Sequence, residues 1–140
     1  MTTHSLIDKI LDLKVFAVTG VSRDPEKYGY VVYRKLKSAG YTVYAVNPNS
    51  DSIDNDPCYP GLDNLPGIVD CVVTVTPPEI TESSMLGAGR LKIRYVWMQP
   101  GSESASACNQ ARAQGLQVVS GGPCILVSIT QRQDRHGHTD

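Results

Sequence analysis

The sequence predicts an α/β fold: a single Rossmann-like domain, with a doubly wound parallel sheet of about five strands and helices on both faces. Five apolar, β-rich runs recur along the 140 residues. Segments with helical spacing separate these runs, an alternation typical of parallel sheets wound by right-handed crossovers. A chain of 140 residues is also long enough to bury one core without disulfides, and too short for two domains of ordinary size.

Each predicted strand is nearly continuous in apolar residues, which indicates burial on both faces of the sheet. The strands are 15–19 (VFAVT), 41–46 (YTVYAV), 71–75 (CVVTV), 94–99 (RYVWMQ) and 116–120 (LQVVS). Helices are expected between them, over 29–39, 78–88 and 102–114. Gly40 and Gly115 stand where a helix would end, and Ser102 is a candidate N-cap.

The segment 47–67 has the composition of a loop, because it is rich in Pro, Asp, Asn and Gly. A flexible linker is the alternative, but its apolar residues favour an ordered loop with one short helical turn at 62–65. We therefore expect one Rossmann-like domain over residues 1–130. The polar residues 131–140 are expected to form a flexible tail.

Composition excludes several classes of protein. A formal net charge of -1 gives no basic patch for nucleic acid, and no apolar stretch is long enough for a signal peptide or a membrane span. The four cysteines lack CxxC spacing and the three histidines lie near the ends of the chain, which argues against a metal site. Reduced thiols are typical of the cytoplasm, where we expect the protein.

Charge is nevertheless uneven along the chain. Five bases lie within 23–37 against the two acids Asp24 and Glu26, whereas 38–89 contains acids and neither Lys nor Arg. Arg34, Lys35 and Lys37 fit a solvated helix face, but Arg23 and Lys27 flank the turn after the first strand. An anionic ligand is therefore expected near that turn.

The turn at 20–29 has the features of a phosphate-binding loop. Gly20 permits close approach of the backbone, and the following helix offers unpaired N–H groups at its start. The side chains of Ser22, Arg23, Lys27 and Tyr28 can all donate to phosphate oxygens. Where a dinucleotide fingerprint would have its second and third glycines, the chain has Ser22 and Pro25.

The second strand ends in Asn47-Pro48, where an NAD-binding domain usually has a carboxylate for the ribose hydroxyls. This disfavours NAD and favours a ribose that carries a phosphate. The residues leave NADP and coenzyme A as alternatives. Ligands of open α/β sheets bind at the carboxyl ends of the strands, where this chain has further candidates in Thr76-Pro77, Gln99 and Cys124.

Six motifs in order resemble the stand-alone CoA-binding domain family, whose Rossmann domain also begins the succinyl-CoA synthetase α subunit. They are GVSRDPEKYGY, GYTVYAVNPN, CYPGL, VDCVVTVTPPE, VWMQPG and GGPCILV, within residues 15–127. The resemblance implies that CoA or an acyl-CoA is the ligand.

The resemblance also implies a place for each part of the ligand. The pyrophosphate would lie near Gly20, Ser22 and Arg23, with Lys27 at a phosphate group. Asn47 and Pro48 would border the adenosine. The remaining arm would pass Thr76, Pro77 and Gln99.

Two departures limit what the resemblance implies. The synthetase reaction needs a second domain with a phosphorylated histidine, and there is no histidine between His4 and His136. Many stand-alone members have a charged residue shortly before the last cysteine, where this chain has GGP.

The sequence favours a binding protein over an enzyme, and it predicts no catalytic residue. Cys124 is the one cysteine at a strand end, but no histidine lies near it in the sequence to serve as a base. An NADP-linked enzyme, or a thiol-dependent one that uses Cys124 in the same cleft, is the alternative. A homodimer or an unknown protein partner is left open.

Overall fold

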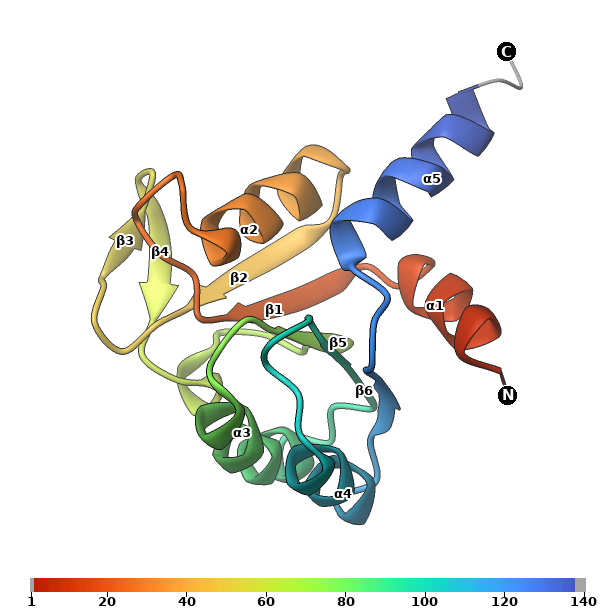
Figure 1. Cartoon of the computed structure of the whole chain (residues 1–140). Helices are drawn as coiled ribbons and strands as arrows, with labels where there is room; N and C mark the ends of the chain where they lie inside the picture. Colours follow the sequence, from red (N-terminus) through yellow and green to blue (C-terminus); the bar gives the residue numbers. More distant parts are fainter. Residues whose placement is uncertain (1, 138–140) are drawn as a thin grey trace.

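The computed structural model of the chain describes residues 2–137 (Figure 1). Its α-helices are α1 (Thr3–Leu11), α2 (Tyr28–Ser38), α3 (Pro78–Arg90), α4 (Ala105–Ala113) and α5 (Ile125–Gly137). Its strands are β1 (Val15–Thr19), β2 (Thr42–Val46), β3 (Ser52–Ile53), β4 (Asp56–Tyr59), β5 (Cys71–Thr74), β6 (Tyr95–Met98) and β7 (Gln117–Val119). A single 3₁₀ turn, η1, covers Leu62–Asn64 in this part of the chain.

The strands form a seven-stranded sheet in the order β3-β4-β2-β1-β5-β6-β7. Only β3 is antiparallel to its neighbour among these strands. With β3 set aside, the parallel strands stand in the chain order 3-2-1-4-5-6, the order of a Rossmann fold. The predicted class is confirmed, and each of the five predicted strands is present with at most two residues fewer.

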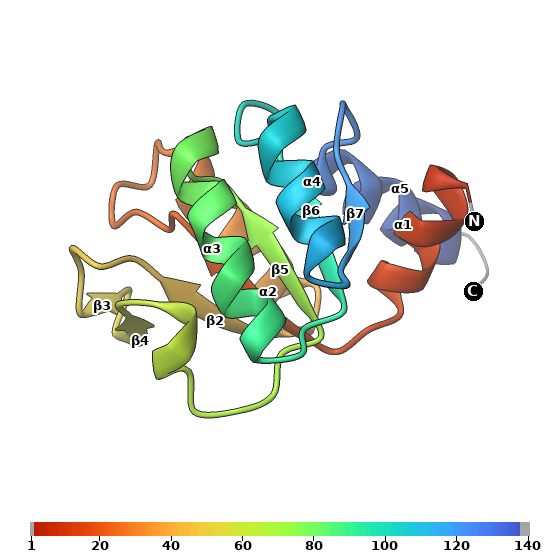
Figure 2. The ribbon, with the colours of Figure 1, turned by 90° about the horizontal axis from the view of Figure 1, so that it is seen from below.

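Helices cover both faces of the sheet. In Figures 1 and 2, α3 and α4 lie on one face, while α1, α2 and α5 lie on the other. Side chains of a strand alternate between faces, so Phe16 and Val18 pack beneath α2, and Ala17 packs toward α3. Trp97, fully buried on β6, lies in the core between the sheet and helices α1, α2 and α5. None of the helices within residues 2–137 is long and apolar enough to cross a bilayer.

The loop predicted over 47–67 contains a hairpin that the sequence analysis missed. Strands β3 and β4 have only two and four residues, and Asp54 and Asn55 between them adopt positive φ angles of 50° and 71°. Asp and Asn tolerate this left-handed region better than most residues, which permits the tight turn. β4 then pairs with β2 in parallel and extends the sheet. The predicted short helical turn is confirmed by η1.

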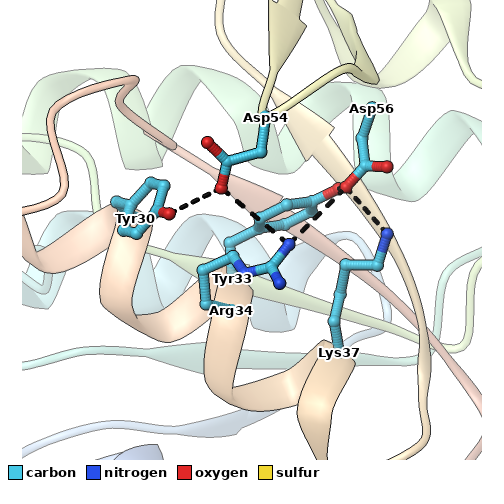
Figure 3. A network of polar contacts seen from close by, with 6 residues as sticks. All are labelled: Tyr30, Tyr33, Arg34, Lys37, Asp54 and Asp56. Carbon is cyan, nitrogen blue, oxygen red and sulfur yellow. Dashed lines mark hydrogen bonds and ion pairs between the residues drawn. The ribbon is translucent and has the colours of Figure 1, made fainter.

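Polar contacts hold the hairpin against α2 (Figure 3). Asp56 accepts hydrogen bonds from the Tyr33 hydroxyl at 2.9 Å and from Lys37 Nζ at 2.8 Å. Asp54 accepts one from the Tyr30 hydroxyl at 2.5 Å. The hydrogen bond from Lys37 is the main cause that holds the pKa of Asp56 below its ordinary value of 3.8, and the hydrogen bond from Tyr33 lowers it further. The side chains of Asp54 and Asp56 therefore anchor the hairpin to the helix.

Replacing Asp56 with asparagine is expected to lower the free energy of unfolding by about 1 kcal/mol near neutral pH, because a charge-assisted contact is lost at a partly exposed site. The depressed pKa means that Asp56 contributes this stability above pH 3.8, and that it is lost as the pH falls through the lower, folded-state pKa. Urea unfolding at pH 7 and pH 3 measures both effects. In the matched control Asp63→Asn, which removes a more exposed pair with Arg90, we expect little change.

Two boundaries differ from the predictions at the C-terminal half. Helix α4 begins at Ala105, and Ser104 rather than Ser102 is its N-cap, because the chain first turns at Gly101 with a φ of 93°. Ser102 is instead buried in a hydrogen bond with Thr74. The polar tail predicted over 131–140 is helical up to residue 137, as the last part of α5. Residues 138–140 lie outside the described residues.

Helix α5 continues past residue 130 because its polar residues find partners in α1 and α2. Arg132 forms a hydrogen bond with Asp12, and Arg135 lies near Asp8. Gln133 accepts a hydrogen bond from Lys35 at 3.1 Å. The polar residues Arg132, Gln133 and Arg135 thus belong to a helix, and they connect it to α1 and α2.

Candidate functional site

The candidate residues lie along the edge of the sheet where the parallel strands have their carboxyl ends. Gly20 follows β1, Asn47 follows β2, Thr76 comes after β5, and Gln99 follows β6. Cys124 directly precedes α5, beyond the end of β7. The winding reverses between β1 and β5, which are neighbours in the sheet. Such a switch point is where open α/β sheets bind ligands.

Close packing of Gly20 against Gly29 shapes the loop 20–29. Gly20 has a φ of 87°, and its N–H donates to the Val46 carbonyl at 3.0 Å. A Cβ atom on Gly29 would lie 2.1 Å from the Gly20 carbonyl oxygen, so only glycine fits there. The start of α2 is therefore drawn directly against the end of β1. The sequence analysis expected a glycine for close approach at Gly20, and missed the equal requirement at Gly29.

Short-range hydrogen bonds brace the rest of the loop. Ser22 Oγ accepts from the Asp24 N–H at 3.0 Å, and Asp24 Oδ1 accepts from the Glu26 N–H at 3.0 Å. Ser22 therefore keeps its hydroxyl proton free to donate to a ligand. Lys27 is the N-cap of α2 and makes no side-chain cap, which leaves the first N–H groups of the helix available.

The basic residues of 23–37 divide into three sets. Lys37 and Arg34 face the hairpin acids, with Arg34 Nη1 3.9 Å from Asp54 and from Asp56. Lys35 donates to Gln133 on α5. Arg23 and Lys27 are exposed on the loop, and neither forms an ion pair within residues 2–137.

A cavity of about 280 Å³ opens beside the loop, on the α3 side of the sheet. Gly20, Pro48 and Thr76, all predicted, line it. Thr19 also lines it, and its hydroxyl is buried without a partner among the described residues. Because buried polar atoms are nearly always paired in proteins, this wall favours a ligand with polar groups.

Helix α3 supplies a wall of the cavity that the sequence analysis did not foresee. The residues are Ile80, Ser83, Ser84, Gly87 and Arg90. They follow the spacing of one helix face, which was the available signal, but nothing in the sequence said what that face covers. Arg90 donates to Asp63 at 2.9 Å across the same cavity lining.

Asn47 turns inward, toward the loop. Its Nδ2 donates to the Val21 carbonyl at 2.6 Å, and its Oδ1 accepts from the Asn49 N–H at 2.8 Å. The residue was expected to border the adenosine. In the structure it ties the end of β2 to the loop after β1, while its neighbour Pro48 lines the cavity.

Tyr28, Gln99 and Cys124 meet at the other side of the loop. The Tyr28 hydroxyl lies 3.1 Å from Gln99 Oε1 and 2.6 Å from Cys124 Sγ. Gln99 Oε1 also accepts from the Ile125 N–H at 3.0 Å. Burial is the main cause that raises the pKa of Tyr28, and the hydrogen bond with Cys124 raises it further. The hydroxyl therefore keeps its proton at neutral pH.

The remaining candidates lie at the start of α3. Pro77 is exposed and precedes the helix as its N-cap, and the Thr76 hydroxyl bonds the Thr81 hydroxyl at 2.8 Å. Thr76 thus lines the cavity with its hydroxyl already paired. Within residues 2–137 no three His, Cys, Asp or Glu side chains are grouped as a metal site would need.

Comparison with known proteins identifies a family. The sequence profile described as "CoA binding domain" matches residues 14–130. The chain is similar to the α subunit of ADP-forming acetate–CoA ligase II from Pyrococcus furiosus, with 29% identity over 92 residues. It is also similar to ADP-forming acetate–CoA ligase I from Archaeoglobus fulgidus, with 33% identity over 84 residues.

The matched segments cover 65% and 60% of this chain, but only 20% of the first ligase and 12% of the second. Among solved structures, a conserved hypothetical protein from Pyrococcus furiosus superposes with a TM-score of 0.77 at 34% identity, covering 83% of this chain and 99% of that chain. A protein from Thermus thermophilus superposes with a TM-score of 0.83 at 25% identity, covering 94% and 98%.

Proposed function

Because the chain belongs to the CoA-binding domain family, we propose that it binds coenzyme A or an acyl-CoA across the carboxyl ends of its strands. The phosphates would lie on the loop 20–29, and the adenosine would occupy the adjoining cavity. The observation that carries this proposal is that a loop with two basic side chains, neither in an ion pair within residues 2–137, meets a cavity at the switch point of the sheet.

The loop supplies enough donors for the pyrophosphate and the 3′-phosphate of CoA together. Arg23, Lys27, the Ser22 hydroxyl and the N–H groups at the start of α2 are available without breaking a contact. Each charge-assisted hydrogen bond contributes roughly 1.5–3 kcal/mol when shielded, and less on the surface. Two or three such bonds would anchor the ligand.

The second strand supports CoA over NAD. Its end carries Asn47, whose amide is held by the loop, and Pro48 at the cavity wall, so no carboxylate stands there to accept from ribose hydroxyls. A phosphorylated ribose avoids charge repulsion at this position. Lys27 is the residue that we assign to the 3′-phosphate.

We further propose that the role is binding without catalysis. Cys124 has the Tyr28 hydroxyl as its neighbour, and a neutral tyrosine is a poor base. His4 lies near Asp8 on α1, in an exposed pair. All four cysteines are free thiols, which supports a reducing compartment such as the cytoplasm.

Isothermal titration with CoA, acetyl-CoA, NADP and NAD tests the proposed ligand. We expect CoA and acetyl-CoA to bind, and NADP and NAD to bind at least about 10-fold more weakly. A 10-fold difference corresponds to about 1.4 kcal/mol of binding free energy, which the two dinucleotides would lack. Tight binding of NADP with no heat from CoA would reject the proposal, and would favour an NADP-linked enzyme in the same cleft.

A further inference from the structure

Cys124 differs from the other three cysteines in its surroundings. Cys58, Cys71 and Cys108 are buried in the cores, whereas Cys124 is partly exposed. It directly precedes α5, and its carbonyl accepts from the Ser128 N–H at 3.1 Å, so it stands as the N-cap of a 13-residue helix. Its sulfur therefore lies at the positive end of the helix dipole.

The Tyr28 hydroxyl suits either protonation state of the Cys124 sulfur. A thiol can donate to the tyrosine oxygen while the tyrosine donates to Gln99 Oε1. When the sulfur is ionised, the same hydroxyl can rotate and donate to it. Gln99 Oε1 then keeps the Ile125 N–H as a donor.

The amide of Gln99 supplies an independent sign of a ligand. Gln99 is fully buried, and its Nε2 has no hydrogen-bond partner among the described residues. The amide cannot be turned over, because the Ile125 N–H needs an acceptor and would then face an NH₂ group. Gln99 Oε1 contacts the Tyr28 hydroxyl, so Nε2 of the same amide lies close to Tyr28 and Cys124. What Nε2 lacks there is a hydrogen-bond acceptor, such as a carbonyl oxygen.

The surroundings leave room for such an acceptor. Gly121 and Gly122 precede Pro123-Cys124, and a Cβ atom added at either glycine would meet no atom within 4 Å. Cys124 also lines a cavity of about 250 Å³ between α1 and α5. The arm of a CoA whose phosphates lie at β1 reaches this end of the edge after three strand spacings, about 14 Å.

We propose that Cys124 binds CoA covalently, as a mixed disulfide formed by exchange with the disulfide of CoA. This inference rests on the proposed function and adds a redox role to the same site. The Cys124 thiolate attacks one sulfur of CoA disulfide, and the new S–S bond forms as the old one breaks. Cys124 is oxidised, the released CoA sulfur is reduced, and that leaving thiolate takes a proton from water.

Gln99 is a positioning residue in this exchange. Its Nε2 donates to the carbonyl oxygen of the last amide of the CoA arm, which brings the two sulfurs together. The exchange is reversed by a free thiol, so that the protein holds CoA under oxidising conditions and releases it when thiols return.

The test is the rate of adduct formation with CoA disulfide and with glutathione disulfide, followed by intact mass and peptide mapping. For the unmodified chain we expect one CoA on Cys124, formed at least about 10-fold faster than the glutathione adduct, because binding raises the effective concentration. Cys124→Ser should form no adduct, and the matched control Cys108→Ser should form it normally.

The variant Gln99→Glu keeps the acceptor for Ile125 and Tyr28 but removes the N–H donors. We expect its rate with CoA disulfide to fall more than its rate with glutathione disulfide, so that the ratio of the two rates approaches one. Equal rates for the two disulfides in the unmodified chain, or an adduct on another cysteine, would overturn the inference.

Titration of Cys124→Ser with CoA separates this inference from the proposed function. If CoA binds but no selective adduct forms, the covalent role fails and the binding role stands. If neither protein binds CoA, the proposed function fails and the inference fails with it.

Discussion

Replacing Gly29 with alanine is expected to abolish most CoA binding and to destabilise the fold. The added Cβ would stand 2.1 Å from the Gly20 carbonyl oxygen, a backbone atom that cannot rotate away. The loop must then move off the start of α2, which costs about 1–3 kcal/mol of unfolding free energy. Loss of one or two phosphate contacts should lower CoA affinity by roughly 10- to 100-fold. Urea unfolding and isothermal titration measure the two effects.

Gly87 provides the matched control for this variant. It is also a buried helical glycine, but a Cβ there would approach no atom more closely than Arg90 Nη2, at 3.6 Å. Gly87→Ala should leave stability unchanged, or raise it by up to about 1 kcal/mol, because alanine is the better helix former. If Gly29→Ala were as stable as Gly87→Ala, the close packing of Gly20 against Gly29 would be wrong.

Removing both loop cations, with Arg23→Ala and Lys27→Ala together, is expected to lower CoA affinity by about 100-fold at low salt without changing stability. Both side chains are exposed and form no ion pair within the described residues, so the fold does not depend on them. Each substitution removes about 1–2 kcal/mol of binding free energy from a charge-assisted contact with phosphate. The difference from the unmodified chain should shrink as salt screens the phosphates.

Lys35→Ala serves as the control for a lost positive charge, since Lys35 bonds Gln133 away from the loop. It should bind CoA normally. An equal loss in Lys35→Ala and in the loop variant would mean that net charge, rather than the loop, attracts the ligand.

Dephospho-CoA assigns the phosphate that Lys27 contacts. If Lys27 meets the 3′-phosphate, Lys27→Ala weakens CoA by about 10-fold and dephospho-CoA hardly at all. Equal losses for the two ligands would contradict that assignment and place Lys27 on the pyrophosphate.

Most of the sheet could be predicted from the sequence because its strands are buried on both faces. Continuous apolar runs such as 15–19 and 71–75 have few other interpretations, and the helical segments between them fix the parallel order. The β3–β4 hairpin escaped this reasoning. Its strands are too short for a pattern, and its place is set by the anchoring of Asp54 and Asp56 on α2, a contact between segments distant in sequence.

The candidate site shows the same division. Gly20 and the loop could be identified because a strand, a glycine and a helix start follow one another in the chain. The inward turn of Asn47 could not be foreseen, since its partner is the Val21 carbonyl on another loop. The α3 wall of the cavity was equally hidden, because amphipathic spacing shows a face and not what it meets.

The helical form of residues 131–137 was not predicted, for a related reason. Residues 131–137 are polar, but a helix on a surface needs only one apolar stripe, and Ile125 and Ile129 begin that stripe before the polar segment. The hydrogen bond between Arg132 and Asp12 then holds this part of α5 against the end of α1.

Amide NMR of the protein titrated with CoA shows whether the ligand lies on the loop 20–29, because each backbone N–H reports its own surroundings. We expect the largest shifts in the loop 20–29, with smaller ones at Thr76, Gln99 and the cavity wall of α3, and none at Gly40 and Tyr41, which lie at the opposite edge of the sheet. Saturable CoA binding that leaves 20–29 unchanged, with shifts confined to another face of the sheet, would contradict this expectation.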